Sequence, residues 1–322
     1  MDLEGLGLAS SDLREARARV ARHARVTPLL PADALSDRLG RPIFLKAENL
    51  QVGGAFKIRG AANFIARLDE AARARGVITY SSGNHGIAVS LAARRAGVPA
   101  VVVMPGTAPA VKLARVRALG AEVHQVGPSS LDRKARAEVL QRERGLAMVP
   151  PFDHAWIVAG QATCGVEILE QCPDVGTILV PVGGGGLAAG IALACRHHRA
   201  AARVVGVEPE GAAKMSASLR AGEPVTLAST ASIADGLLPA RPGDLTFTVI
   251  RNAVSEVVTV ADSAIREAAL LLLKDEHLLV EWSGSVGVAA LLAEAVRPAG
   301  GPVVVVLSGG NADPAAITDQ AT

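Results

Sequence analysis

The distribution of hydrophobic and polar positions along the chain predicts alternating strands and helices. From Val77 onward, short β-branched apolar runs alternate with longer Ala-, Arg- and Leu-rich segments of helical period, which is typical of successive βα units. The apolar runs predict strands at Val77–Tyr80, Ala100–Met104, Glu122–Val126, Thr177–Val182, Val204–Val207, Val257–Val260 and Val303–Leu307. The segments between them predict helices at Gly86–Ala96, Pro109–Leu119, Leu131–Glu143, Gly160–Gln171, Leu187–His197, Ala261–Asp275 and Ser285–Val296. The pattern therefore indicates an open α/β architecture, with mostly parallel sheets flanked by helices.

Two interruptions of this pattern indicate how the chain divides into domains. One lies near Leu68–Arg75, and the other is the stretch Ala147–Asp153, which contains two adjacent prolines. A chain of 322 residues also exceeds the size at which a single core usually stops growing. We therefore expect a small domain over residues 68–151, and a large domain built from residues 1–67 and 152–322.

Composition and charge favour an enzyme that acts on a small molecule. The 33 Lys+Arg residues nearly balance the 31 Asp+Glu residues, without the long basic blocks of proteins that bind nucleic acid or membrane surfaces. The longest apolar runs are far shorter than a membrane span. The N-terminal segment lacks the apolar core of a signal peptide and predicts an amphipathic helix instead. Cys164, Cys172 and Cys195 are isolated, which indicates neither zinc nor disulfides and favours the reducing cytoplasm.

A glycine tract follows the predicted strand Thr177–Val182. Backbone amides of Gly183–Gly186 at the start of a helix can cradle a phosphate group, helped by the helix dipole. The same glycines also fit a dinucleotide-binding fingerprint, because Glu208 ends the next strand at the spacing of a ribose-binding acid. A turn that merely packs a helix closely onto a strand is the structural alternative. Four consecutive glycines argue against that alternative, because each costs backbone entropy without burying a side chain.

Two further strand ends carry short polar side chains. The strand Val77–Tyr80 leads into Ser81–His85, where backbone amides can hold a carboxylate and Asn84 can bond a ring hydroxyl. Helix capping by serine or asparagine explains the same residues structurally. The last strand ends in Ser308, followed by glycines. Both segments lie where open α/β sheets bind ligands.

Lys57 follows Phe56 and a run of small residues. An amine in a partly dry pocket has a lowered pKa and is free for Schiff-base chemistry. Spacing alone favours the simpler interpretation of a solvated lysine on a helix surface. A catalytic role for Lys57 can therefore be inferred only together with the glycine tract, the Ser81–His85 segment and the strand end at Ser308.

Together and in this order, the four motifs resemble those of fold-type-II pyridoxal-phosphate enzymes (tryptophan synthase β-like), particularly the serine/threonine dehydratase (threonine ammonia-lyase) and serine racemase family. The resemblance spans nearly the whole chain and includes Phe152-Asp153-His154 and Ile233-Ala234-Asp235-Gly236. It implies a two-lobed fold and pyridoxal 5′-phosphate as cofactor, with Lys57 forming the Schiff base. The cofactor-binding residues that it implies are Lys57, Phe56, Asn84, Gly183, Gly184, Gly185, Gly186, Leu187, Ser308 and Gly309.

The resemblance implies a dehydratase that converts a β-hydroxy amino acid, such as L-threonine or L-serine, to a 2-keto acid and ammonia by αβ-elimination. Lys57 would remove the α-proton, and a hydroxyl at Ser308 facing the ring nitrogen favours elimination over a long-lived carbanion. The implied substrate-binding residues are Ser81, Ser82, Asn84 and His85. Ser82 also matches the second acid/base of serine racemases, so catalysis is expected from Lys57 and Ser82. Racemisation, or dehydration of another substrate such as 3-hydroxyaspartate, is the alternative, and a homodimer is the family expectation.

Two departures from the family pattern bear on the site. Several members bind a divalent cation through an acid in the position of Glu208 and a second acid six residues later, where this chain has Lys214. An ammonium group there would repel a divalent ion and replace it by an ion pair, so we expect no metal. Trp282 is either a core aromatic residue or a side chain that reshapes the pocket. A nicotinamide-dependent dehydrogenase and a binding protein without chemistry are the remaining alternatives, and Lys57, Asn84 and Ser308 argue against the latter.

Overall fold

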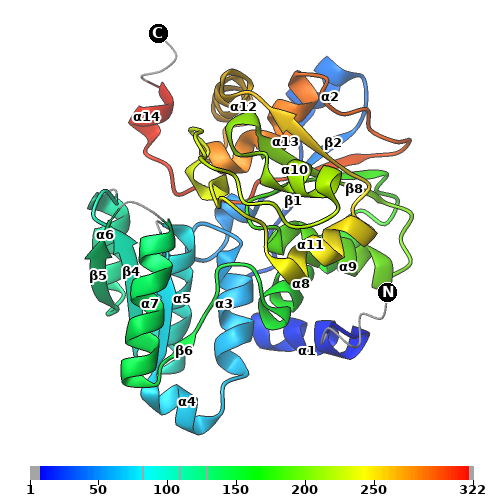
Figure 1. Ribbon diagram of the computed structural model, residues 1–322. Helices are drawn as coiled ribbons and strands as arrows, with labels where there is room; N and C mark the ends of the chain where they lie inside the picture. The colour runs from blue at the N-terminus through cyan, green and yellow to red at the C-terminus, as the bar shows by residue number, and fades with distance from the viewer. Residues whose placement is uncertain (1–7, 82, 109, 128–129, 319–322) are drawn as a thin grey trace.

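In the computed structural model, which describes residues 8–318 except 82, 109, 128 and 129, the chain forms two sheets (Figure 1). The larger sheet has the order β1-β2-β10-β7-β8-β9, and only β1 runs antiparallel to its neighbour. The smaller sheet has the order β5-β4-β3-β6 and is parallel throughout. The strands are β1 Leu29–Pro31, β2 Ile43–Lys46, β3 Val77–Tyr80, β4 Ala100–Pro105, β5 Glu122–Val126, β6 Ala147–Met148, β7 Thr177–Pro181, β8 Arg203–Pro209, β9 Glu256–Val260 and β10 Val303–Val306.

Helices cover both faces of the larger sheet. Alternate residues of its central strands point to opposite sides, so that Ile178 and Val304 pack against α1, α8, α9 and α11, whereas Leu179 and Val305 pack against α2, α12 and α13. The helices on the first face are α1 Ser10–Val20, α8 Ala155–Gln171, α9 Gly186–His197 and α11 Asp244–Ala253. The helices on the second face are α2 Asp33–Leu39, α12 Asp262–Lys274 and α13 Trp282–Leu292.

The smaller sheet is also enclosed by helices, and α3 Lys57–Ala66 connects it to the rest of the molecule (Figure 1). On one face Val102 packs with α5 and α6, and on the other Val101 packs against α7. Helix α3 contacts both α5 and α8, so it lies between the two sheets. The remaining helices are α4 Glu70–Arg75, α5 Asn84–Ala96, α6 Ala110–Ala118, α7 Ser130–Arg144, α10 Lys214–Ala221 and α14 Pro314–Thr318.

The predicted fold class is confirmed, because the chain forms open, mostly parallel sheets flanked by helices. Each predicted strand and helix is present in the described part of the chain, although α8 and α13 begin earlier than expected and α13 ends at Leu292 instead of Val296. Pro109, the predicted start of the helix that corresponds to α6, lies outside the described residues. The expected N-terminal helix corresponds to α1. All strands of the smaller sheet lie within residues 77–148. The division into domains at residues 68 and 151 remains a prediction.

The topology brings the carboxyl ends of several strands toward one region. Strand β3 leads into α5, β7 leads through the glycine tract into α9, and β10 leads to Ser308. Among the described residues, every helix is too short or too polar to span a lipid bilayer.

Candidate active site

Lys57 is the first residue of α3, and its backbone is fixed by the end of β10. The amide of Phe56 donates to the carbonyl of Ser308 at 3.1 Å, and Ala55 forms an isolated β-bridge with Gly309. The Lys57 amine donates to the carbonyl of Pro151 at 2.8 Å and lies 5.0 Å from the centre of the Phe56 ring. These contacts bring the predicted lysine and the Ser308 motif together, although they are far apart in the sequence.

Burial of the Lys57 amine lowers its pKa to about 8, an effect that the nearby Glu281 carboxylate partly opposes. Near pH 8, therefore, a large share of these amines is uncharged and can act as a nucleophile. This environment differs from that of a solvated surface lysine.

A buried ionic cluster holds α3 in place directly behind Lys57. Arg59 is 1% exposed and forms hydrogen bonds with both oxygens of Glu48 and of Glu167, at 2.7–2.8 Å. Lys46, at the end of β2, donates to Glu167 at 2.7 Å. Because the cluster joins β2, α3 and α8, it fixes the helix that presents Lys57. Glycine at position 160 permits the close approach of α8, since a Cβ atom there would lie 2.6 Å from the carbonyl oxygen of Arg59.

The glycine tract forms a sharp turn between β7 and α9. Gly185 has a φ of +98°, which favours glycine, and a Cβ atom on Gly184 would lie 2.3 Å from the Phe152 ring. The backbone amides of Gly184, Gly185, Gly186 and Leu187 find no acceptor among the described residues. This set of free donors at the start of α9 is suited to an anion such as phosphate. Phe152 lies over the tract, next to the Pro151 carbonyl that accepts from Lys57.

Asn84, the first residue of α5, lies between the side chains of Glu281 and Asn311. Its amide nitrogen donates to Glu281 at 2.6 Å, and its oxygen accepts from Asn311 at 2.9 Å. Asn311 also donates to the carbonyl of Gly53 at 2.9 Å. The orientation of Asn84 is therefore fixed from the opposite side of the site.

Glu281 is a functional candidate that our sequence analysis did not identify. Its carboxyl group is buried, and one oxygen has no partner among the described residues. Burial raises its pKa to about 7, and Asp235 adds to this effect, while Lys112 and Asn84 oppose it. A Cβ atom on Gly309 would lie 2.3 Å from this carboxyl group, which explains the need for glycine there. The sequence feature that could have pointed to Glu281 is a carboxylate directly after the apolar segment Leu278–Val280, at the start of a helix.

The Ser81–His85 segment lies at the carboxyl end of β3. The Ser81 hydroxyl is buried and accepts from the amide of Gly83 at 3.0 Å, which shapes the turn into α5. His85 contacts the carbonyl of Val149 at 3.1 Å through Nε2, and its Nδ1 has no partner among the described residues. Burial and the Lys57 charge lower the pKa of His85 to about 3, so its ring is neutral at physiological pH. Ser82, the predicted second acid/base, lies outside the described residues.

The groups gathered here fit pyridoxal 5′-phosphate. The site combines a Schiff-base-competent amine, a turn of free amides for a phosphate group, and the buried hydroxyl of Ser308, which is 4% exposed and has no hydrogen-bond partner among the described residues. Asn84 provides an oriented amide at the same site. The contacts unite Lys57, Phe56, Asn84, Ser308 and Gly309 with the glycine tract, whereas their roles toward the cofactor remain predictions.

The ion pair predicted between Glu208 and Lys214 is present. The Lys214 ammonium lies 3.0 Å from the Glu208 carboxylate and donates to the carbonyls of Val182, Ala212 and Leu237, at 2.9–3.0 Å. Both side chains are fully buried. Four oxygens thus surround an ammonium group just behind the glycine tract, where a cation bound from solution would have to compete with it.

Trp282 packs against apolar side chains. Its side chain is partly buried against the hydrophobic core formed by α12 and α13, at the first position of α13. This contact favours the first of the two interpretations given for it above.

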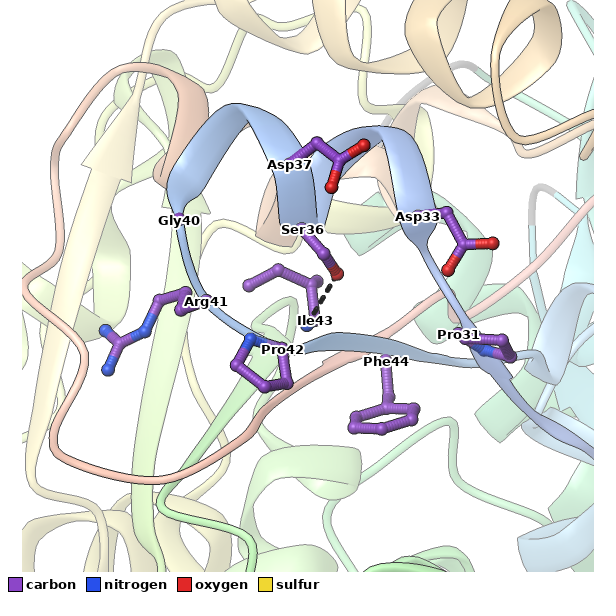
Figure 2. A pocket seen from close by; sticks show the side chains of 9 residues that line it. All are labelled: Pro31, Asp33, Ser36, Asp37, Gly40, Arg41, Pro42, Ile43 and Phe44. Atoms are coloured by element: carbon purple, nitrogen blue, oxygen red, sulfur yellow. Dashed lines mark hydrogen bonds between the residues drawn. The ribbon is translucent and has the colours of Figure 1, made fainter.

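A hollow of about 520 Å³ lies elsewhere, between α2 and β2. Figure 2 shows the Asp33 and Asp37 carboxylates on α2, and the Ser36 hydroxyl bonded to the amide of Ile43. The Arg41 guanidinium donates to the carbonyls of Pro298 and Ala299. No residue of the four motifs lines this hollow, so it is separate from the site around Lys57.

Comparison with known proteins agrees with this geometry. A family model described as pyridoxal-phosphate dependent enzyme matches residues 20–309. An L-threonine ammonia-lyase of Geobacter sulfurreducens is 45% identical over 94% of this chain and 75% of its own length. A serine racemase of Oryza sativa subsp. indica is 40% identical over 94% of this chain and 90% of its own length. The solved structure of maize serine racemase superposes with a TM-score of 0.92 at 38% identity, covering 97% of this chain and 96% of that one.

Proposed function

Because this chain belongs to the family of pyridoxal-phosphate dependent enzymes, we propose that it is a dehydratase that converts a β-hydroxy amino acid to a 2-keto acid and ammonia by αβ-elimination. L-threonine and L-serine are the proposed substrates. The observation that carries the proposal is the Lys57 amine, which has a lowered pKa and lies between the glycine tract and the end of β10. The 45% identity to an L-threonine ammonia-lyase supports the choice of reaction.

Each of the gathered residues has a proposed part in holding the cofactor. The amides of the tract from Gly183 to Leu187 bind its phosphate, and Asn84, oriented by Glu281 and Asn311, bonds its ring oxygen. The hydroxyl of Ser308 bonds its ring nitrogen. When bound, pyridoxal 5′-phosphate supplies the electron sink that makes the substrate α-proton acidic.

The protein's own groups then move the protons. The Lys57 amine, once free, takes the α-proton of the substrate, and its pKa of about 8 lies close to the operating pH that favours a general base. The backbone amides of Asn84 and His85, at the start of α5, hold the substrate carboxylate near the positive end of that helix, and Ser81 shapes the turn that precedes them. His85 is neutral in this environment, so its contribution is to position the segment rather than to supply charge.

The proposal is tested by offering the purified holoenzyme L- and D-forms of threonine, serine and 3-hydroxyaspartate, and measuring keto acid and ammonia. Lys57→Ala is expected to abolish both products, while Lys274→Ala, which removes an exposed lysine on α12, leaves them unchanged. Turnover retained by Lys57→Ala, or no keto acid from any of these substrates, would refute the assignment.

A racemase is the second candidate, since the maize serine racemase structure superposes over nearly the whole chain. Racemisation requires a second proton donor on the opposite face of the substrate, and we propose Ser82 for that role. The wild type should then exchange the α-proton of the substrate and form the opposite enantiomer. Ser82→Ala should lose this exchange while it continues to catalyse elimination. Turnover of 3-hydroxyaspartate in preference to threonine would instead identify the substrate as a dicarboxylic one.

We further propose that the enzyme is a cytoplasmic homodimer without a divalent metal. The free and buried Cys164, Cys172 and Cys195 suit a reducing compartment, and the ion pair of Lys214 with Glu208 supports the absence of the metal. Light scattering of the purified holoenzyme tests the dimer, because a monomeric mass would contradict it.

A further inference from the structure

A second hollow, of about 420 Å³, lies among the helices beside α3. It is lined by Arg19, Arg22 and His23 from α1 and the turn after it, by Arg73 from α4, and by Arg95 from α5. Apolar side chains of α3 and α5, mostly alanines, form the rest of its lining. Figure 1 shows α1 beside α3, with α4 following the far end of α3. We refer to this hollow as the arginine pocket, and none of the residues assigned to the active site lines it.

The positive charge of the arginine pocket is poorly compensated. Arg19 pairs with the carboxylate of Glu15, one turn earlier on α1. Arg73 and Arg95 donate only to backbone carbonyls, those of Ala96 and His23, at 3.0 and 2.6 Å. Arg22 has no partner among the described residues. Hence four guanidinium groups share one carboxylate.

Capping of helix ends explains only part of this arrangement. The carbonyls that Arg73 and Arg95 contact lie at or just beyond the ends of α5 and α1, where positive side chains are favoured. One N–H group of each guanidinium is enough for that contact, and a guanidinium has several. Most of the donors around the arginine pocket are therefore available to a ligand.

His23 is a second, independent sign of a binding site. Its Nδ1 atom is buried in the pocket wall and has no partner among the described residues. Buried polar atoms in native proteins nearly always have one. Burial lowers the pKa of His23, and the charges of Arg95, Arg22 and Arg73, which line the same hollow, lower it further. A neutral imidazole can still donate to an oxyanion through one nitrogen.

We propose that the arginine pocket binds a small molecule that carries a phosphate group. Guanidinium groups match phosphate oxygens in pairs of parallel hydrogen bonds, which makes arginine clusters selective for this group. The volume is greater than a lone phosphate requires and falls within the range of ordinary small-molecule sites. The apolar lining, which includes Ala62 and Ile65, contacts the organic part of the ligand.

The test uses the holoenzyme, in which bound cofactor occupies the glycine tract, so that added phosphate reports on a different site. Inorganic pyrophosphate is titrated calorimetrically into the wild type, Arg22→Glu and Arg14→Glu at low, constant ionic strength. Arg14 is the matched control, because it is an exposed arginine on α1, the helix that precedes Arg22, and lies outside the arginine pocket. We expect one ligand per wild-type chain, a loss of affinity of at least about tenfold in Arg22→Glu, and near wild-type affinity in Arg14→Glu.

Arg22 is exposed and unpaired among the described residues, so its replacement leaves the packing of the fold intact. Arg22→Gln/Arg95→Gln, with an unchanged melting temperature, provides a second measure of the loss. Absence of binding to the wild type, or equal affinity of the wild type, Arg22→Glu and Arg14→Glu, would overturn the proposal. Keto-acid formation is measured separately, so either outcome leaves the proposed function to its own test.

Discussion

Replacing Glu281 by glutamine tests the electrostatics of the site most directly. The carboxyl group is 5% exposed, and its pKa is raised from the ordinary 4.5 to about 7, first by burial and then by Asp235. In the unfolded chain the same group titrates near 4.5. Between these two pH values the folded protein holds a proton that the unfolded chain releases, so the free energy of unfolding falls as the pH rises.

The magnitude follows from the two pKa values. A rise from 4.5 to about 7 corresponds to about 3 kcal/mol of unfolding free energy, present below pH 4.5 and lost by about pH 7. Glu281→Gln has a similar shape and does not ionise, so it lacks this loss. We therefore expect the variant to gain about 3 kcal/mol in stability, relative to the wild type, as the pH rises from 4.5 to 7.5.

The assay is urea unfolding of the cofactor-free wild type and variant at several pH values, because the other titrating groups cancel in the difference between the two proteins. A difference that does not change with pH would refute the assignment of a raised pKa to Glu281. The variant should also lower the pKa of Lys57 further, since the Glu281 charge is what opposes the effect of burial on that amine. The pH dependence of borohydride-trapped Schiff base reports this second change.

Three further substitutions and one treatment with chelators probe the surroundings of the site. Gly184→Ala places a Cβ atom 2.3 Å from the Phe152 ring, so we expect the variant to bind the cofactor more weakly. The absorbance of the bound cofactor during dialysis measures this loss, and unchanged retention of the cofactor would contradict the role of the glycine tract. Lys214→Met leaves Glu208 buried without its ion-pair partner and should cost about 3–5 kcal/mol in urea unfolding. Chelators should not reduce wild-type turnover, and a loss that Mg²⁺ restores would contradict the metal-free site. Arg59→Met should likewise cost about 3–5 kcal/mol, whereas Arg38→Met, on the surface, should cost less than about 1 kcal/mol.

The parts of the fold that the sequence predicts well are those with strong local signals. The run Thr177–Pro181 is apolar after its first residue and is soon followed by glycines, so both strand β7 and the start of α9 could be placed from sequence to within a residue. Neighbouring residues alone determine such a boundary, because turn chemistry and the apolar period change at the same point.

Strand β2 was not predicted, because it depends on distant partners. It has only four residues, Ile43–Lys46, and ends in a lysine that is fully buried. That lysine is tolerated because Glu167, on α8, neutralises it. Nothing within the segment itself indicates this partner, so a local pattern cannot distinguish it from an exposed loop.

The same limit applies to the site. The motifs around Asn84 and Ser308 could be recognised from their order, but the contact of Asn84 with Glu281 joins residues 197 positions apart. Glu281 carries no pattern of its own and gains its raised pKa only from burial beneath Gly309 and near Asp235. Residues whose role comes from tertiary burial are the ones that sequence reasoning misses.

The ionic cluster behind Lys57 fixes the orientation of α3 without changing the net charge near the reactive amine. Arg59 and Lys46 are paired with Glu48 and Glu167, so two positive and two negative side chains balance one another. A balanced cluster fixes α3 without placing a net charge near the reactive amine. The shift in the pKa of Lys57 accordingly comes from burial and from Glu281. Because Lys57 and Arg59 are two positions apart, they point to different sides of α3, one into the site and the other into the cluster. The helix can thus be held rigidly while its first residue keeps an amine that is free to react.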